Sequence, residues 1–272
     1  MVHRDLYKSR GTHLLSTRIP GATLVAMKLA VVIPMYNESK HIVACLDSLD
    51  AQSRRADEIV LIDNNSTDNT VKLAEKYDVT IISEPQQGIW AARSRGFDEA
   101  MDCCDVMAFT DADARFPADW LKKIDEEFKN DDLQALTGPG LFYDGGKLVN
   151  WLGKVIYMQP YFIGVGLAMD MKPLFASNAA IRASTWKSVR DTVHRDDQKL
   201  HDDVDLSYHL QPITTIKYRA DLITYISTRP FYSFRGMVKR YYIGFRSLFI
   251  HWDTQAPWHI YGRRLAEHKK SD

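Results

Sequence analysis

Residues Val106 to Asp113 read VMAFTDAD, a short apolar run that ends in two carboxylates. Such a run is typical of a buried strand, and ligands of open α/β sheets bind beyond the carboxyl ends of the strands. Asp111 and Asp113 therefore offer, at a ligand-binding edge, the hard oxygen ligands that suit Mg²⁺ or Mn²⁺ carrying a diphosphate. An acid-x-acid triplet alone is weak evidence, because many such triplets are solvated turns.

The flanking sequence alternates between strand and helix patterns. Helical spacing of apolar residues over 38–49, 67–77 and 89–101 predicts helices, and Pro117 is well placed to begin another. Four strands are predicted, at 28–34, 58–63, 79–83 and 105–110. This alternation predicts an α/β fold with a doubly wound, mainly parallel sheet flanked by helices.

The chain is expected to divide into three parts. Residues 1–26 lack an apolar core segment and predict a flexible N-terminal arm rather than a secretory signal. Residues 27–228 are expected to form the main domain, with a short helix over 202–210 and one or two strands over 213–226. Residues 229–272 predict a basic, aromatic C-terminal helical extension, in which apolar residues from 237 to 252 recur at helical spacing.

Composition narrows the function classes. The 272 residues are 45% hydrophobic and 26% charged with zero net charge, which fits a globular domain and gives no basic field for nucleic acid. Three cysteines form neither a disulfide framework nor a C-x-x-C pair, so a reducing, cytoplasmic location is expected. No uncharged apolar run reaches the length of a membrane span.

Polar residues at the carboxyl ends of the predicted strands, and at the start of the helix over 89–101, can meet in one crevice. There Tyr36 offers a flat face to a nucleobase, Asp63 an acceptor for a base N–H, and Arg93 donors for a carbonyl or phosphate. Asp111 can hold ribose hydroxyls or a metal, and Asp113 a metal. Each residue has a structural alternative: a core aromatic, a turn former or a surface charge. The ordered set favours a nucleotide site.

Four segments resemble the pattern of the family 2 glycosyltransferases, which have the GT-A fold. They are VVIPMYNE (31–38), VLIDNNSTDNT (60–70), GIWAARSRG (88–96) and FTDADARFPADW (109–120). The resemblance implies that a sugar is transferred from a UDP- or GDP-sugar to an acceptor hydroxyl, usually with inversion, assisted by Mg²⁺ or Mn²⁺. By the same resemblance, the nucleotide is held by Pro34, Tyr36, Glu38, Asp63, Arg93 and Asp111, and the metal by Asp111 and Asp113.

This chain departs from the family pattern at two positions. Ser94 follows Arg93 where the family usually has Asn, and Arg115 stands where some relatives carry a metal-binding side chain. An arginine cannot ligate a cation. The carboxylate pair, phosphate oxygens and water would therefore have to complete the metal's coordination.

Inverting transfer also needs a base for the acceptor hydroxyl. The segment 201–206, HDDVDL, resembles the family's Glu-Asp-x-x-Leu segment, with Asp202 in place of Glu and Asp203 at the base position. The alternative is that these acids cap a helix, and Asp205 is assigned to that helix. The segment 177–182 resembles the family's segment beneath sugar and acceptor, which gives Ser177 and Asn178 a supporting role there. Asp202 is assigned the same supporting role for substrate and acceptor.

Several alternatives stay open. The C-terminal helix could lie on an anionic membrane surface, peripheral to its inner face, or pack on the domain. Membrane contact would favour a lipid-linked acceptor or a polysaccharide precursor. A sugar-nucleotide nucleotidyltransferase is a second enzyme class, although its Gly-rich loop is missing after the first strand. The third hypothesis is a catalytically inactive nucleotide-sugar-binding protein. Donor sugar, nucleobase and acceptor remain undetermined.

Overall fold

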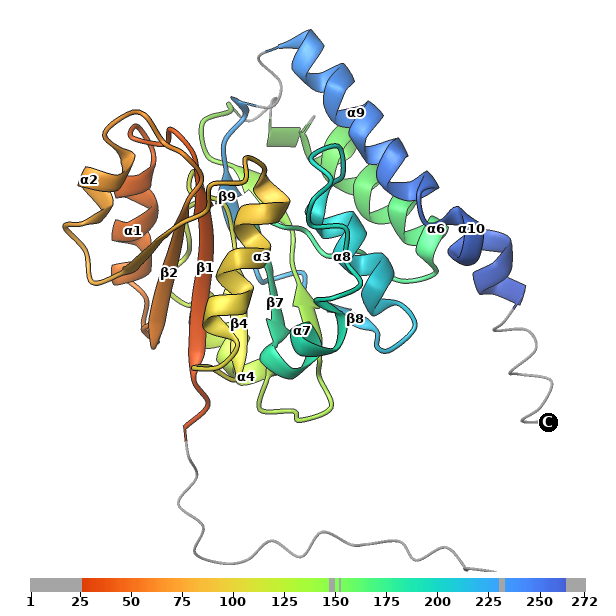
Figure 1. The fold of residues 1–272 in the computed structure, drawn as a ribbon, viewed down its shortest axis with the longest axis horizontal. Coiled ribbons are helices and arrows are strands. Elements are labelled where there is room, and N and C mark those ends of the chain that lie inside the picture. The colour runs from red at the N-terminus through yellow and green to blue at the C-terminus, as the bar shows by residue number, and fades with distance from the viewer. Residues whose placement is uncertain (1–25, 147–149, 152, 230–232, 263–272) are drawn as a thin grey trace, which may run out of the picture.

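A seven-stranded sheet forms the centre of the protein (Figure 1). The computed structural model describes residues 26–146, 150–151, 153–229 and 233–262. The strand order is β3-β2-β1-β4-β7-β5-β8, and β6 and β9 pair separately in parallel. The strands are β1 (Leu29–Met35), β2 (Glu58–Asp63), β3 (Thr80–Ser83), β4 (Val106–Phe109), β5 (Ala135–Thr137), β6 (Gly140–Phe142), β7 (Ala179–Arg182), β8 (Ile216–Tyr218) and β9 (Thr224–Ile226).

The sheet is mainly parallel, as the alternation of strands and helices predicts. Strand β1 pairs in parallel with β2 and β4, β2 pairs in parallel with β3, and β5 pairs in parallel with β8. Among the described strands of this sheet, only β7 runs antiparallel to its neighbours, which are β4 and β5. The carboxyl ends of β1, β2 and β4 therefore meet at one edge.

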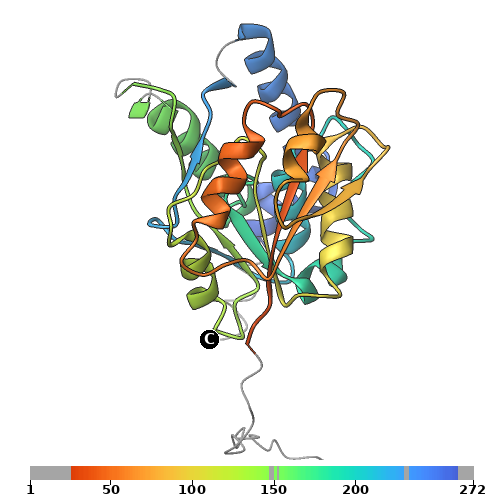
Figure 2. The same cartoon turned by 90° about the vertical axis from the view of Figure 1, so that its left-hand side faces the viewer.

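Helices cover both faces of this sheet, because alternate residues of β1 face opposite ways. Leu29, Val31 and Ile33 pack with the apolar side of α1 (Ile42–Asp50) and α4 (Trp120–Glu127). Ala30 and Val32 pack with the opposite layer, seen in front of the sheet in Figure 1. That layer contains α3 (Ile89–Ala100), α7 (Ala183–Val189) and α8 (Asp202–Leu210). Figure 2 shows α1 facing the viewer, with α2 (Thr70–Ala74) beside it.

Helix α3 lies close against the sheet at Gly96. A Cβ at this position would lie 2.4 Å from both Ile62 Cδ1 and Val32 Cγ1. Only a residue without a side chain allows this approach. The contact brings the start of α3 over the ends of β1 and β2.

The predicted elements match the structure in type, with different ends. The helix expected from residue 38 begins at Ile42, and the one expected over 67–77 is confined to α2. Strands β5, β6 and β7, which have three or four residues each, were not predicted. The irregular apolar stretch after residue 150 forms helical turns in series: η1 (Gly153–Met158), η2 (Tyr161–Val165) and α6 (Gly166–Met169).

The C-terminal extension is helical in its described part. Helix α9 (Phe234–Phe249) crosses the edge of the molecule and leads into α10 (Trp252–Gln255) (Figure 1). Ser233 caps α9, because its hydroxyl accepts a hydrogen bond from the Gly236 N–H at 3.2 Å. Leu248 packs on α8 residues Val204 and Tyr208. The expected N-terminal arm lies outside the described residues, apart from its last residue.

Candidate active site

A cavity of about 360 Å³ opens at the carboxyl ends of β1 and β4. Six of the residues selected from the sequence line it: Pro34, Tyr36, Glu38, Asp111, Asp113 and Ser177. Five others do not belong to its lining: Asp63, Arg93, Asn178, Asp202 and Asp203. The structure thus gathers the two acids of the triplet with the end of β1, although some 75 residues separate them in sequence.

Loops that are distant in sequence are tied together at this edge. Asn37 adopts a left-handed conformation, with φ 54°, and its side-chain oxygen accepts a hydrogen bond from the Thr67 N–H at 2.8 Å. The Thr70 hydroxyl accepts from the Glu38 N–H at 2.7 Å. These bonds fix the turn after β1, where Tyr36 is left half-exposed.

The β2 loop and the start of α3 are joined by Asn64. Its side-chain oxygen accepts a hydrogen bond from the Gly88 N–H at 2.8 Å, and its amide donates to the Glu84 carbonyl at 2.9 Å. Asp63 lies at the end of β2, where its carboxylate accepts from the Ser66 N–H at 3.2 Å. In the described contacts Asp63 therefore holds the turn, and its predicted base-binding role remains a prediction.

Arg93 does not line the cavity itself. It contacts Asp111, which does. The side chain is buried, and its Nη2 donates to Asp111 Oδ1 at 2.8 Å. Its Nη1 donates to the Thr110 carbonyl at 3.1 Å, and its Nε to Asp202. Burial alone would lower the pKa of Arg93, but the two carboxylates raise it above its usual value. The cation therefore stays charged and orients Asp111 towards the cavity.

Arg229 bridges two of the carboxylates at the cavity. Its Nη1 and Nη2 donate to the two oxygens of Glu38 at 3.0 and 2.9 Å, and its Nε donates to Asp113 Oδ2 at 3.2 Å. Although burial acts to lower the pKa of Arg229, these acids raise it. The pKa of Glu38 is raised, because partial burial outweighs its bond to Arg229.

Asp203 lies directly behind the cavity wall. It occupies the first turn of α8, is buried, and accepts a hydrogen bond from the Ala176 N–H at 3.3 Å. Ala176 stands between Phe175 and Ser177, which both line the cavity. Burial, and next the charge of Asp202, raise the pKa of the Asp203 carboxyl. A buried carboxyl with a raised pKa beside a cavity is typical of proton-transfer sites.

Ser177 and Asn178 differ in their surroundings. The Ser177 hydroxyl donates to Asp111 Oδ2 at the cavity. Asn178 is fully buried, where it accepts from the Trp120 indole N–H at 2.8 Å and donates to the Pro139 carbonyl at 2.9 Å. Asn178 thus supports the strands beneath the site through contacts within the chain.

The donor set at the cavity fits a hard divalent cation. Glu38, Asp111 and Asp113 present carboxylates there, and carboxylate oxygens are ligands that Mg²⁺ and Mn²⁺ prefer. Arg115 is directed elsewhere, since its guanidinium lies 4.1 Å from the centre of the Tyr143 ring. A cation bound by Asp113 would have to compete with Arg229.

Several cavity residues escaped prediction from the sequence. Arg229 follows β9, so its place at a strand end was a usable signal, but its partners lie 116 and 191 residues away. Asn64 and Ile89 also line the cavity; they lie in two segments that resemble the family but were given no role. No local motif marks Gln87, Tyr157, Phe175, Ser227 and Arg240. Only the packed fold brings them to the acids.

The sequence and the fold both have known relatives. The family described as Glycosyl transferase family 2 matches residues 30–194, more than half of the chain. A dolichol-phosphate mannosyltransferase of Pyrococcus furiosus is 34% identical over 131 residues, which cover 46% of this chain and 36% of that protein. The glycosyltransferase AglE of Haloferax volcanii is 27% identical over 128 residues, 44% of this chain and 39% of AglE. The matched stretch thus spans about two fifths of these relatives.

Solved structures show the same fold. The mannosyltransferase PcManGT of Pyrobaculum calidifontis, in complex with GDP-Man and Mn²⁺, has a TM-score of 0.58 at 18% identity, covering 80% of this chain and 61% of that one. TarS of S. aureus in complex with UDP has a TM-score of 0.58 at 18% identity, covering 82% and 65%. The fold is therefore the GT-A fold. With the matched family covering four strand–helix units and the acid triplet, this chain belongs to glycosyl transferase family 2.

Proposed function

We propose that this protein is a metal-dependent, inverting hexosyltransferase that moves a sugar from a UDP- or GDP-sugar to an acceptor hydroxyl. The observation that carries the proposal is the meeting of Tyr36, Asp111 and Asp113 at one cavity, with Asp203 directly behind its wall. PcManGT and TarS, which share the fold, are seen with GDP-Man and UDP. Their ligands support a nucleoside-diphosphate donor here.

In the proposed complex the base stacks on exposed Tyr36, near Pro34, and hydrogen-bonds to Asp63. Asp111 and Asp113 hold the divalent cation, which would stabilise the negative charge on the diphosphate as it leaves. Arg93 keeps Asp111 oriented, because it binds Asp111 and Asp202 together. The carboxylate of Asp111 thus needs no rearrangement when the donor arrives.

Asp203 is the proposed base. The acceptor oxygen attacks the anomeric carbon, the bond from that carbon to the diphosphate oxygen breaks, and Asp203 takes the hydroxyl proton. Attack opposite the leaving group inverts the configuration. Ser177 supports the sugar from the side of Asp111, to which its hydroxyl donates.

The catalytic unit is proposed to span residues 27–228, and residues 229–272 form its extension. The extension supplies Arg229 and Arg240 to the cavity. Among the residues that the structure describes, no helix is long and apolar enough to cross a membrane.

Helix α9 supports a peripheral contact with an anionic membrane. Five large apolar side chains on it are about half exposed: Val238, Tyr241, Tyr242, Phe245 and Phe249. Residues 229–252 contain five Lys or Arg and no acid. An exposed aromatic stripe with basic residues is typical of helices that lie on anionic bilayers. Such a location, on the inner face of a membrane, would present a lipid-linked acceptor to the cavity.

Two sets of measurements test these proposals. Calorimetry should show UDP or GDP binding that requires Mn²⁺ and is lost in Asp113→Asn, whereas Asp203→Asn should bind the donor and fail to transfer. Binding of neither nucleotide would refute the donor site. In a flotation assay the protein should rise with anionic liposomes and not with neutral ones. Phe245→Glu should abolish this binding, whereas Ile213→Glu, at a similarly exposed position outside α9, should not.

The sugar-nucleotide nucleotidyltransferase and the inactive binding protein predict other outcomes. The first would release pyrophosphate from a nucleoside triphosphate and a sugar phosphate. The second would bind the donor without ever transferring or hydrolysing it. The three carboxylates at the cavity favour catalysis over binding alone, since clustering partly buried acids costs stability.

A further inference from the structure

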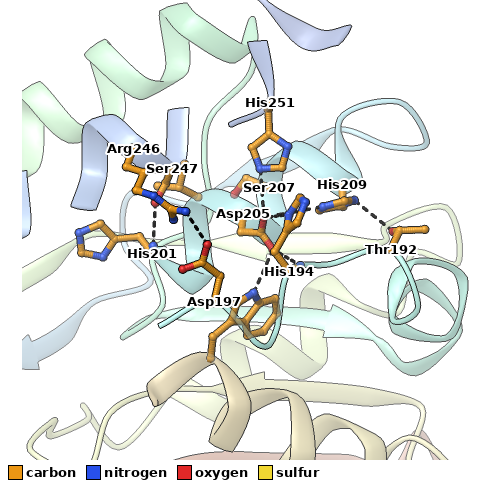
Figure 3. Close-up of polar contacts among 12 residues, drawn as sticks. Thr192, His194, Asp197, His201, Asp205, Ser207, His209, Arg246, Ser247 and His251 are labelled. Atoms are coloured by element: carbon orange, nitrogen blue, oxygen red, sulfur yellow. Dashed lines mark hydrogen bonds and ion pairs between the residues drawn. The ribbon is translucent and has the colours of Figure 1, made fainter. Parts of the chain in front are cut away.

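Three histidines surround one buried aspartate at the junction of α8 with the C-terminal helices. Figure 3 shows His194, His209 and His251 pointing towards Asp205. The centres of the three imidazole rings are 5.4, 5.3 and 5.3 Å apart, so the rings form a nearly equilateral triangle. The four possible ligand atoms lie within 4.8 Å of one another. Three imidazoles and a carboxylate thus converge on one point.

The carboxylate of Asp205 is fixed independently of the imidazole rings. The Trp90 indole N–H and the His194 backbone N–H both donate to its Oδ2 at 2.9 Å. This leaves Oδ1 facing the rings. His194 Nδ1 lies 2.7 Å, His251 Nε2 3.0 Å and His209 Nε2 3.7 Å from that oxygen.

The tautomer of His209 follows from its outer neighbour. The Thr192 hydroxyl donates its hydrogen to the Val189 carbonyl at 2.8 Å, so towards His209 Nδ1, at 3.1 Å, it can only accept. In neutral His209 the hydrogen therefore resides on Nδ1, and the lone pair of Nε2 is directed at the cluster. This Nε2 is buried and has no hydrogen-bond partner among the described residues. A fixed second nitrogen is the usual support of a metal-binding histidine.

We propose that His194, His209, His251 and Asp205 form a Zn²⁺ site. Three imidazoles and a carboxylate are ligands that tetrahedral zinc accepts, with bonds near 2.0–2.1 Å, so ligand atoms stand about 3.3 Å apart. The separations of 2.7, 3.0 and 3.7 Å around Asp205 Oδ1 bracket this value. Small rotations of the rings would open the centre for the ion, and the partly exposed His194 provides an entry path.

Four side chains of the protein would fill the tetrahedral coordination of the zinc and leave no open position, as in structural zinc sites. None of the four residues belongs to the described lining of the donor cavity. The ion would join α8, which carries Asp203, to the loop before it and to the turn between α9 and α10. His251 in that turn is further held by stacking on Tyr208, with ring centres 4.4 Å apart. Zinc therefore clamps the C-terminal extension to the helix of the proposed base.

Zinc titration of the full chain tests the proposal without any assay of transfer. The protein is stripped with a chelator and titrated with Zn²⁺ against a chromophoric competitor, and Co²⁺ is used for the visible spectrum. We expect one tightly bound equivalent, a tetrahedral Co²⁺ spectrum and a higher melting temperature with Zn²⁺. Absence of stoichiometric binding by the wild-type chain would overturn the site, whatever the fate of the proposed function.

Variants separate ligands from bystanders. His209→Ala should lose the tight equivalent, and Thr192→Val, which removes only the outer acceptor, should weaken it roughly 10–100-fold. His259→Ala removes an exposed histidine outside the cluster and should change nothing, and Asp113→Asn should keep the zinc because it alters only the donor cavity. Circular dichroism checks that each variant is folded. Tight binding retained in a folded His209→Ala would refute the ligand set.

Discussion

The guanidinium of Arg229 lies against the carboxylate of Asp113, with Nε 3.2 Å from Oδ2, and also bridges to Glu38. The family resemblance implies that Asp113 binds a metal, so Arg229 and the proposed metal would share one carboxylate. Because Arg229 is partly exposed at 40%, its pairing is adjustable. Arg229 thus neutralises part of the negative charge of Glu38 and Asp113 before a metal or donor binds.

Arg229→Gln should therefore bind Mn²⁺ more tightly. The ion pair is partly exposed and worth about 1 kcal/mol, so the affinity should rise roughly fivefold. At saturating Mn²⁺, the affinity for UDP or GDP should fall, since a guanidinium binds phosphate well. Mn²⁺ titration followed by electron paramagnetic resonance measures the first effect. Arg235→Gln, an exposed change on α9, is the control, and equal shifts in both variants would contradict the prediction.

Arg93→Met should destabilise the protein strongly. Its loss leaves the buried Asp202 without its cation, and breaking a buried pair by removing one partner costs about 3–5 kcal/mol. Urea denaturation measures the free energy of unfolding. Arg95→Met in the same helix breaks a pair with Glu99 in which both side chains are about half exposed, so its cost should stay below about 1 kcal/mol. Similar losses of stability in the two variants would show that burial of the ion pair does not determine the cost of breaking it.

As the pH is lowered, the rate of transfer should decline at a higher pH than it would if the base were an aspartate with an ordinary pKa. The base must be ionised, and burial raises the pKa of Asp203 above its usual value of 3.8. The same shift means that Asp203 contributes stability below its unfolded pKa, and this stability is lost as the pH rises through its folded pKa. The rate-against-pH profile checks the first statement. A profile whose acid limb lies at an ordinary aspartate pKa would argue for another base.

In Asp203→Asn the pH-dependent loss of stability should disappear. The free energies of unfolding of the wild type and the variant should be equal at a pH below the unfolded pKa of Asp203. They should separate as the pH rises through its folded pKa. A constant difference at all pH values would show that the carboxyl titrates alike in the folded and unfolded chains.

Gly96→Ala should cost stability through the contact of α3 with the sheet. The added Cβ would lie 2.4 Å from Ile62 and Val32, and overpacking of a core typically costs about 1–3 kcal/mol. Gly164→Ala in η2 has open space around its Cβ and should be neutral or stabilising, because alanine favours helices. Thermal melting of both variants measures the difference. A stable Gly96→Ala protein would show that α3 can move away from the sheet.

Local patterns determined most of the parallel sheet. The runs that predict β1, β2, β3 and β4 each contain several apolar residues, and β1 and β4 are apolar throughout because both of their faces are buried. The strands β5, β6 and β7 escaped prediction, although the predicted strands β3 and β4 also have only four residues. The aromatic stretch from 151 to 169 was ambiguous, since polar residues and Pro160 interrupt its pattern.

The sequence by itself determined that four strands end beside polar groups and that Asp111 and Asp113 follow one of them, because these features depend on neighbours along the chain. Only the tertiary structure decided that Arg93 lies buried between Asp111 and Asp202, that Arg229 reaches Asp113, and that three histidines meet at Asp205. Apart from the pair of Asp205 and His209, which both lie in α8, these contacts join residues from separate elements. Their positions follow from how helices pack on the sheet, which no local periodicity encodes.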